Sequence, residues 1–264
     1  VSSPVALSVL IAVGAGAQAL GVTSEAVYAG LRVRPILQHE LRDAPPVEPL
    51  AWRAFFNFYI PLALTSLLTL LWQPLGSAAM ARMPRPVETL AALPALNGLM
   101  FFLRSSGMAF NEVVVAMLDR RGSYRPIRRF AMLLMGASLL VNLLLALSPF
   151  SRFWFQQVSA LRPELVELAV GAFVLGIPIS ALTVLQSLYQ GTILYGRVTR
   201  GIPESLAAFL LVFLLGLGAG VVSGKITGLY VGIGALTLAN IAQTLWVWLR
   251  SRPIAKDLKA RDSA

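Results

Sequence analysis

The stretch PALNGLMFFLRSSGMAFNEVVVAMLDRR, residues 94–121, is apolar enough to lie in a lipid bilayer and yet carries Arg104 and Glu112. At 1.5 Å per residue, a helix of about 20 residues crosses the ~30 Å hydrocarbon core of a membrane. Apolar runs of this length recur along the whole sequence. The stretch therefore predicts one membrane-spanning helix among several, with charged groups placed where charge is costly.

The composition of the chain supports this interpretation. Its 264 residues are 57% hydrophobic and 13% charged, and the mean hydropathy is +0.73, whereas about a quarter of the residues of a soluble domain are charged. Long Leu, Ala and Val runs favour helices over the alternating strands of a membrane barrel. The predicted fold class is an all-α, polytopic transmembrane helix bundle. About seven spans are expected, at residues 4–31, 54–81, 87–118, 128–149, 165–192, 202–222 and 226–249.

Lysine and arginine are distributed unequally between the two faces that seven spans create. Numbering the connections alternately places sixteen on one face and five on the other, and Arg104 completes the total of 22. By the positive-inside rule, the first face and the C-terminus are predicted to be cytoplasmic, in what we expect to be a bacterial inner membrane. The net charge of +10 is then best assigned to anionic lipid headgroups, so membrane lipids are expected partners and nucleic acid is not.

A polar, proline-bearing connection divides the chain. Residues 32–53 include Pro45, Pro46 and Pro49 and predict a semi-rigid cytoplasmic linker. It separates one helix, residues 1–31, from a six-helix block at 54–250, which is followed by a basic cytoplasmic tail at 251–264. Because the chain opens on VSSPVALSVLIAV, without an initiator Met or a basic leader, we expect it to begin in the middle of a longer protein.

Residue types that carry common enzyme chemistry are scarce. The chain has no Cys and a single His, His39, in the linker, which excludes disulfides, thiolate catalysis and a Cys/His metal cluster in the spans. No nucleophile and base are arranged together in the spans. We therefore predict no enzymatic activity, no cofactor and no metal site.

Three polar residues in the opening stretch recur at intervals of seven. Asn97, Arg104 and Asn111 return to nearly the same helical face, and Glu112 lies at the edge of this stripe. A rise of ~12 Å separates Arg104 from Glu112, too far for an easy ion pair within the helix. A charge at mid-membrane costs at least ~2.5–3.5 kcal/mol, so it should face a wet cavity or a counter-charge. Two interpretations stay open. In the first, Arg104 attracts an anionic substrate and Glu112 is a gating or proton-linked partner. In the second, the charges form structural ion pairs between helices, or the Arg104 side chain extends to the membrane–water interface.

Polar and proline residues on other spans extend this pattern. Amides can line the same interior or lock helices together; the candidates are Gln73, Asn142, Gln186, Gln190, Asn240 and Gln243, with Gln18 and Glu25 in the first span. The predicted substrate pathway comprises Asn97, Arg104, Asn111, Glu112, Gln73, Gln186, Gln190 and Glu25. The predicted kinks or hinges are Pro61, Pro74, Pro94 and Pro178. The GxxxG spacings Gly216/Gly220 and Gly228/Gly232 predict close helix packing.

Three spans resemble a known family. FFNFYIPLALTSLLTLLWQPLGSAAMAR (55–82) resembles the first helix of the C-terminal lobe in progressive ankylosis proteins, which belong to the superfamily of multidrug and toxic compound extrusion transporters and polysaccharide flippases. LPALNGLMFFLRSSGMAFNEVVVAMLDRR (93–121) is similar to that family's next helix, including the glutamate at Glu112. GIPISALTVLQSLYQGTILYGRVTR (176–200) is similar to its tenth helix.

The resemblance covers roughly residues 50–250 and the helix before the linker. It implies a two-lobe, twelve-helix transporter with both termini cytoplasmic, of which this sequence would lack the first five helices. The expected function is export or flipping of a polar, anionic solute by alternating access. The alternative is a non-transporting structural subunit of a larger membrane complex, partnered by the missing N-terminal lobe or by another membrane chain. The missing helices favour the alternative, and the polar stripe favours transport.

Overall fold

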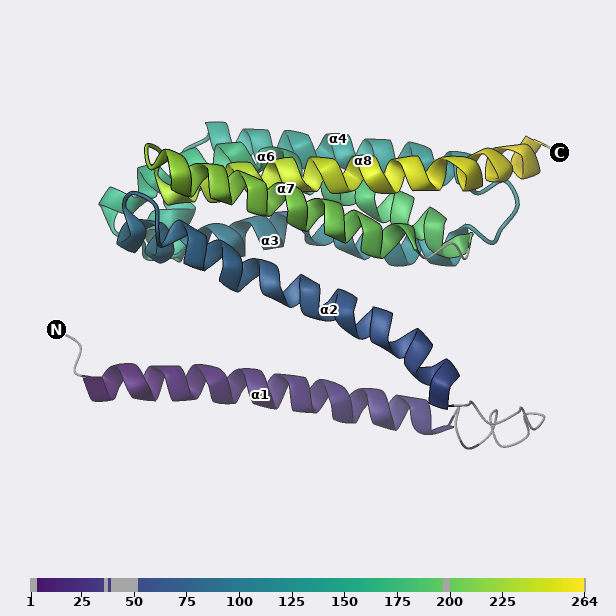
Figure 1. The fold of residues 1–264 in the computed structure, drawn as a ribbon, viewed down its shortest axis with the longest axis horizontal. Helices are drawn as coiled ribbons and strands as arrows, with labels where there is room; N and C mark the ends of the chain where they lie inside the picture. The colour runs from purple at the N-terminus through teal and green to yellow at the C-terminus, as the bar shows by residue number, and fades with distance from the viewer. Residues whose placement is uncertain (1–3, 36–37, 39–51, 197–199, 264) are drawn as a thin grey trace. The chain divides into compact units, whose positions relative to one another are not determined.

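The computed structural model describes residues 4–35, 38, 52–196 and 200–263, and this part of the chain contains helices and no strand (Figure 1). The all-α prediction is confirmed. Two short segments, α5 (Phe150–Phe153) and the π-helical η2 (Trp154–Val158), connect two of the long helices. The long helices are α1 (Pro4–Pro35), α2 (Trp52–Met80), α3 (Pro86–Met117), α4 (Tyr124–Leu147), α6 (Pro163–Tyr195), α7 (Gly201–Ser223) and α8 (Gly228–Ser263).

Five helices in the described part are long and apolar enough to cross a membrane: α3, α4, α6, α7 and α8. They contain the predicted spans 87–118, 128–149, 165–192, 202–222 and 226–249, with ends that differ by a few residues. The chain is thus a membrane protein with several apolar helices. The predicted spans 4–31 and 54–81 lie mainly in α1 and α2, and their crossing of the membrane stays a prediction.

The chain forms two compact units, Val1–Asn57 and Phe58–Ala264. The first contains α1, whose described side chains are exposed, Gln18 and Glu25 among them. Of the predicted linker 32–53, residues 32–35 continue α1 and Trp52 begins α2. Most of the remainder, including His39, lies outside the described residues.

Helix α6 is the centre of the second unit. It packs against α3, α4 and α8, and α7 packs against α8 (Figure 1). α6 is also the most buried of the five apolar helices, which fits a helix surrounded by other helices rather than by lipid. Its side chains contribute to two core clusters, one containing Phe173 and Leu99 and the other containing Val184 and Val114.

Small residues allow the helices to approach closely. A side chain at Gly107 of α3 would lie 3.1 Å from the backbone nitrogen of Val184, and the Ser187 hydroxyl donates a 2.7 Å hydrogen bond to the Gly107 carbonyl. At Gly216 of α7, an added Cβ would lie 2.8 Å from the Cβ of Ala235 in α8. The close packing predicted from the GxxxG spacing is therefore confirmed where α7 meets α8.

The prolines and the predicted tail both lie within helices. α3 continues through Pro94 and α6 through Pro178, while Pro61 and Pro74 lie within α2. Whether any of these positions acts as a hinge stays a prediction. Residues 251–263, predicted as a basic tail, continue α8, and the buried Leu258 joins the second core cluster.

Candidate functional site

The polar stripe of α3 lines two cavities in the second unit. Asn97 borders a cavity of about 500 Å³, and Arg104 and Asn111 border another of about 390 Å³. All three side chains are half-buried. The interval of seven residues therefore placed these groups correctly on one face, and that face is the wall of a hollow interior.

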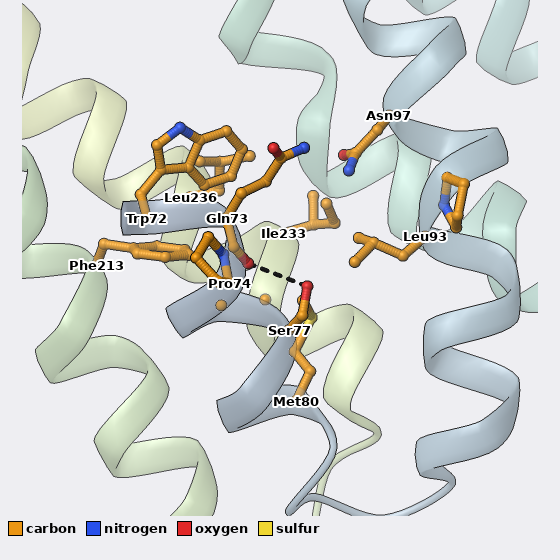
Figure 2. Close-up of a pocket in the computed structure, with 13 residues that line it drawn as sticks. Trp72, Gln73, Pro74, Ser77, Met80, Leu93, Asn97, Phe213, Ile233 and Leu236 are labelled. Carbon is orange, nitrogen blue, oxygen red and sulfur yellow. Dashed lines mark hydrogen bonds between the residues drawn. The ribbon is translucent and has the colours of Figure 1, made fainter. Parts of the chain in front are cut away.

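The first cavity lies between the C-terminal half of α2, the N-terminal half of α3, and α7 and α8 (Figure 2). Its wall is mainly apolar, with Trp72, Leu93 and Phe213 among the larger side chains. The amide side chains of Gln73 and Asn97 border the same space from opposite helices (Figure 2). None of the described residues that line it is charged, so this cavity offers amides and apolar surface to a ligand.

The second cavity is more polar than the first, and a charged side chain is among its described lining residues. Arg104 is the only ionisable side chain among its described lining residues, and none of them is a carboxylate. The uncharged polar lining is Asn111, Thr183, Gln186, Ser187, Gln190, Asn240 and Gln243, and the apolar lining is Trp72, Met108, Ile202, Leu206, Phe209 and Leu236. The cavity therefore carries a net positive charge within a polar wall.

Some of these polar groups are committed to holding helices together. The Gln186 amide nitrogen donates to the Asn240 side-chain oxygen at 3.3 Å and to the Thr244 hydroxyl at 3.1 Å, which ties α6 to α8. The Asn240 amide nitrogen in turn donates to the Leu236 carbonyl at 2.8 Å. These residues are buried and largely satisfied, so their first role is structural.

Four other side chains have no such commitment. No side-chain hydrogen bond to a described residue is made by Arg104, Asn111, Gln190 or Gln243. The Nε atom of Arg104 is inaccessible to solvent and has no hydrogen-bond partner among the described residues. A desolvated cation without a counter-charge is costly unless something else satisfies it. A guanidinium that shares a cavity with amide side chains suits a carboxylate or phosphate, because its planar donors match those oxygens two at a time.

Two residues border both cavities. Trp72 of α2 and Leu236 of α8 line each of them, and Trp72 packs edge-on against Phe209 and Phe213 with ring centroids 6.5 and 6.0 Å apart. They form an apolar boundary between the Asn97 cavity and the Arg104 cavity. Sequence reasoning did not single out either residue; a Trp inside a span, away from the membrane interfaces, was the available signal for Trp72.

The other two predicted pathway residues, Glu112 and Glu25, lie elsewhere, as does the candidate amide Asn142. Glu112 is exposed and lines neither cavity, and Glu25 belongs to the first unit. Asn142 is buried between α4 and α6, where its side chain donates to the Ser138 carbonyl at 2.7 Å and accepts from the Ser180 hydroxyl at 3.4 Å. The described part of the chain holds no cluster of three or more His, Asp or Glu side chains that could bind a metal ion.

Comparison of the chain with protein-family models, with curated proteins and with solved structures gives no match.

Proposed function

We propose that the chain is part of a membrane transporter that exports a polar, anionic solute, and that Arg104 binds the anion in the cavity between α3, α6 and α8. The single observation that carries this proposal is the half-buried Arg104 guanidinium. Its Nε is inaccessible to solvent and has no partner among the described residues, and no carboxylate is among the described residues that line the cavity. A purely structural arginine would instead be expected to pair its donors with protein oxygens.

The neighbouring amides support an anion as the ligand. Asn111, Gln190 and Gln243 present uncommitted amide groups to the same cavity. Amide N–H groups add hydrogen bonds to anion oxygens without adding charge, so the site can hold the anion and still release it. Such a balance is what transport requires, because a site that binds too tightly does not turn over.

The arrangement of the two cavities supports a path rather than a closed pocket. Asn97, Arg104 and Asn111 follow one another along α3 over a rise of about 21 Å, much of the thickness of a hydrocarbon core. Trp72 and Leu236 stand at the boundary between the cavities. Movement of these apolar side chains would connect the two spaces, and the proline-bearing helix α2 carries Trp72.

Relationship to progressive ankylosis proteins and their superfamily is part of the proposal. It rests on the resemblance of residues 55–82, 93–121 and 176–200 and on a bundle of long apolar helices with a polar interior. Under this proposal, a second lobe faces the cavities and the solute passes between the lobes. Glu112 is left without a role in anion binding, since it is exposed and lines neither cavity.

Flux through liposomes tests the proposal. The purified protein is reconstituted and uptake is measured for a panel of labelled anions, with succinate and glucose 6-phosphate as the first probes. Arg104→Gln should lower the flux of the transported anion at least about tenfold, the equivalent of 1.4 kcal/mol of lost binding. Arg162→Gln is the matched control, because it removes an exposed arginine outside both cavities and should leave flux unchanged.

Two results would contradict the proposal. Equal flux in Arg104→Gln and wild-type protein would remove Arg104 from the path. Absence of flux above that of protein-free liposomes for every anion tested would favour the alternative, a structural subunit that does not transport.

A further inference from the structure

Two adjoining cavities occur at the end of the bundle where α4 begins and α8 ends, separate from the Arg104 cavity. Their volumes are about 730 and 320 Å³. They share Tyr124, Arg128, Met132 and Lys259, so they adjoin each other and together form a groove between α4 and α8. We call it the basic groove.

The lining of the basic groove has a single sign of charge. Its cations come from two helices far apart in sequence, and none of its described lining residues is acidic. They are Arg125, Arg128, Arg129, Arg252, Lys256 and Lys259. Converging cations create a positive potential that attracts anions.

Two exposed arginines elsewhere on the bundle have an acidic partner. Arg250 pairs with Glu204 at 2.6 Å, and Arg152 pairs with Glu167 at 2.8 Å. Both pairs are at least partly exposed, so an acidic partner is supplied even where water could screen the charge. No Asp or Glu is among the described residues that line the basic groove.

Aromatic and apolar side chains complete the groove. The Arg252 guanidinium lies 3.6 Å from the centre of the Trp248 ring, which holds it against the wall. Met132 and Leu133 line the groove from α4 and are exposed, as is Leu140 two turns further along the same helix. The cation-lined groove therefore borders an exposed apolar surface of α4.

We infer that the basic groove binds an anionic phospholipid, with the phosphate among the arginine and lysine side chains and an acyl chain along the exposed face of α4. Guanidinium and ammonium groups match phosphate oxygens, and the apolar strip matches hydrocarbon. A soluble phosphate would use the cations and leave Met132 and Leu133 without a function. This inference does not depend on transport through the Arg104 cavity.

The test compares two variants that each remove three positive charges. Arg128→Gln/Arg129→Gln/Lys256→Gln removes three from the groove, and Arg120→Gln/Arg121→Gln/Arg200→Gln removes three exposed cations that line neither part of it. Binding of phosphatidylglycerol and of phosphatidylcholine to the purified protein is measured by native mass spectrometry. A thermal melt of each variant establishes that it is folded.

The groove variant should lose affinity for phosphatidylglycerol at least about tenfold, while the control variant retains it and phosphatidylcholine binds weakly to both. Equal losses in the two variants would overturn the inference, because they would show general attraction to a positive surface. Displacement of phosphatidylglycerol by an equal concentration of inorganic phosphate would also overturn it, in favour of a site for soluble phosphate.

Discussion

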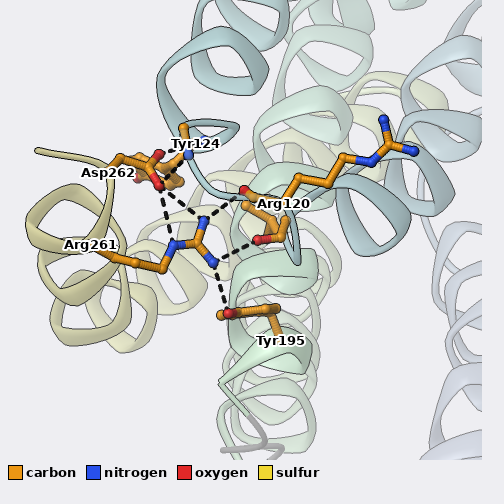
Figure 3. A network of polar contacts seen from close by, with 7 residues as sticks. Arg120, Tyr124, Tyr195, Arg261 and Asp262 are labelled. Carbon is orange, nitrogen blue, oxygen red and sulfur yellow. Dashed lines mark hydrogen bonds and ion pairs between the residues drawn. The ribbon is translucent and has the colours of Figure 1, made fainter. Parts of the chain in front are cut away.

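Arg104 and Arg261 differ in what surrounds their guanidinium groups. Arg261, near the end of α8, donates to the Leu118 carbonyl at 3.0 Å, to the Tyr195 hydroxyl at 2.9 Å and to Asp262 (Figure 3). Arg104, in the middle of α3, has a buried Nε without a partner and faces a cavity. The described chain therefore provides hydrogen-bond acceptors for the Arg261 guanidinium and none for the Nε of Arg104.

The Arg261 network shows how this protein uses charge for structure. Besides the Leu118 carbonyl, Arg261 binds the Arg120 carbonyl at 3.0 Å, so it caps the C-terminal end of α3. Asp262 accepts hydrogen bonds from the backbone nitrogens of Gly122 and Tyr124 at 2.8 and 2.9 Å, at the start of α4. Two adjacent residues thereby fasten α8 to the connection between α3 and α4 (Figure 3). No comparable arrangement of described residues surrounds Arg104, and this contrast supports the proposal that Arg104 binds a ligand.

The largest difference between the two arginines should appear in stability. Arg104→Met keeps an unbranched, flexible side chain and removes a partly desolvated charge, so we expect the free energy of unfolding in detergent to rise by about 1–3 kcal/mol. The measurement is denaturant unfolding of the purified protein. A marked loss of stability would mean that Arg104 holds helices together, and the contrast with Arg261 would disappear.

Arg261→Met should have the opposite effect. The substitution leaves the Leu118 and Arg120 carbonyls without their donor and Asp262 without its cation, so the melting temperature should fall by several degrees. Arg120→Met is the matched control, because only the backbone carbonyl of Arg120 belongs to the network and its side chain extends away from it (Figure 3). Equal melting temperatures for the two variants would contradict a structural role for Arg261.

A smaller effect separates two glutamines one helical turn apart. Gln186→Leu removes the donor that ties α6 to Asn240 and Thr244, and hydrogen bonds between membrane helices contribute about 0.6 kcal/mol each. We expect a loss of about 1 kcal/mol in unfolding free energy. Gln190→Leu should leave stability nearly unchanged and weaken anion binding instead. A loss of stability in both variants, or in neither, would contradict the distinction between Gln186, which is hydrogen-bonded to α8, and Gln190, which is not.

Much of the fold and part of the candidate site follow from local patterns. Apolar run lengths predicted the five clearest spans, and the interval of seven residues placed Asn97, Arg104 and Asn111 on one face of α3. A cavity-lining amide is free to bind a ligand only if it has no hydrogen-bond partner in the protein. Such partners can be more than 50 residues away, as Asn240 is from Gln186, and a local sequence pattern does not predict them. Glu112 shows the limit most clearly: one residue beyond Asn111, its side chain turns about 100° around the helix and is exposed.

The Arg261 network was missed for the same reason. A basic segment after the last span predicts a tail at a membrane surface, and the sequence does not show that α8 continues to meet the connection between α3 and α4. The adjacent Arg261 and Asp262 in an otherwise mainly basic segment were the available signal. Trp72 and Leu236 at the boundary of the two cavities likewise depend on how α2, α7 and α8 pack together.

Thiol labelling of a cysteine placed in the Arg104 cavity tests the central claim most directly. The chain has no native Cys, so Gln243→Cys provides a single reactive position, and Leu140→Cys on the exposed face of α4 provides a control that lipid should shield. Rates are compared for an anionic and a cationic methanethiosulfonate reagent in membranes, with and without Arg104→Gln. A wet, anion-attracting cavity predicts that Gln243→Cys reacts and that Arg104→Gln lowers the anionic-to-cationic rate ratio about tenfold. No reaction at Gln243→Cys, or a ratio that Arg104→Gln does not change, would contradict it.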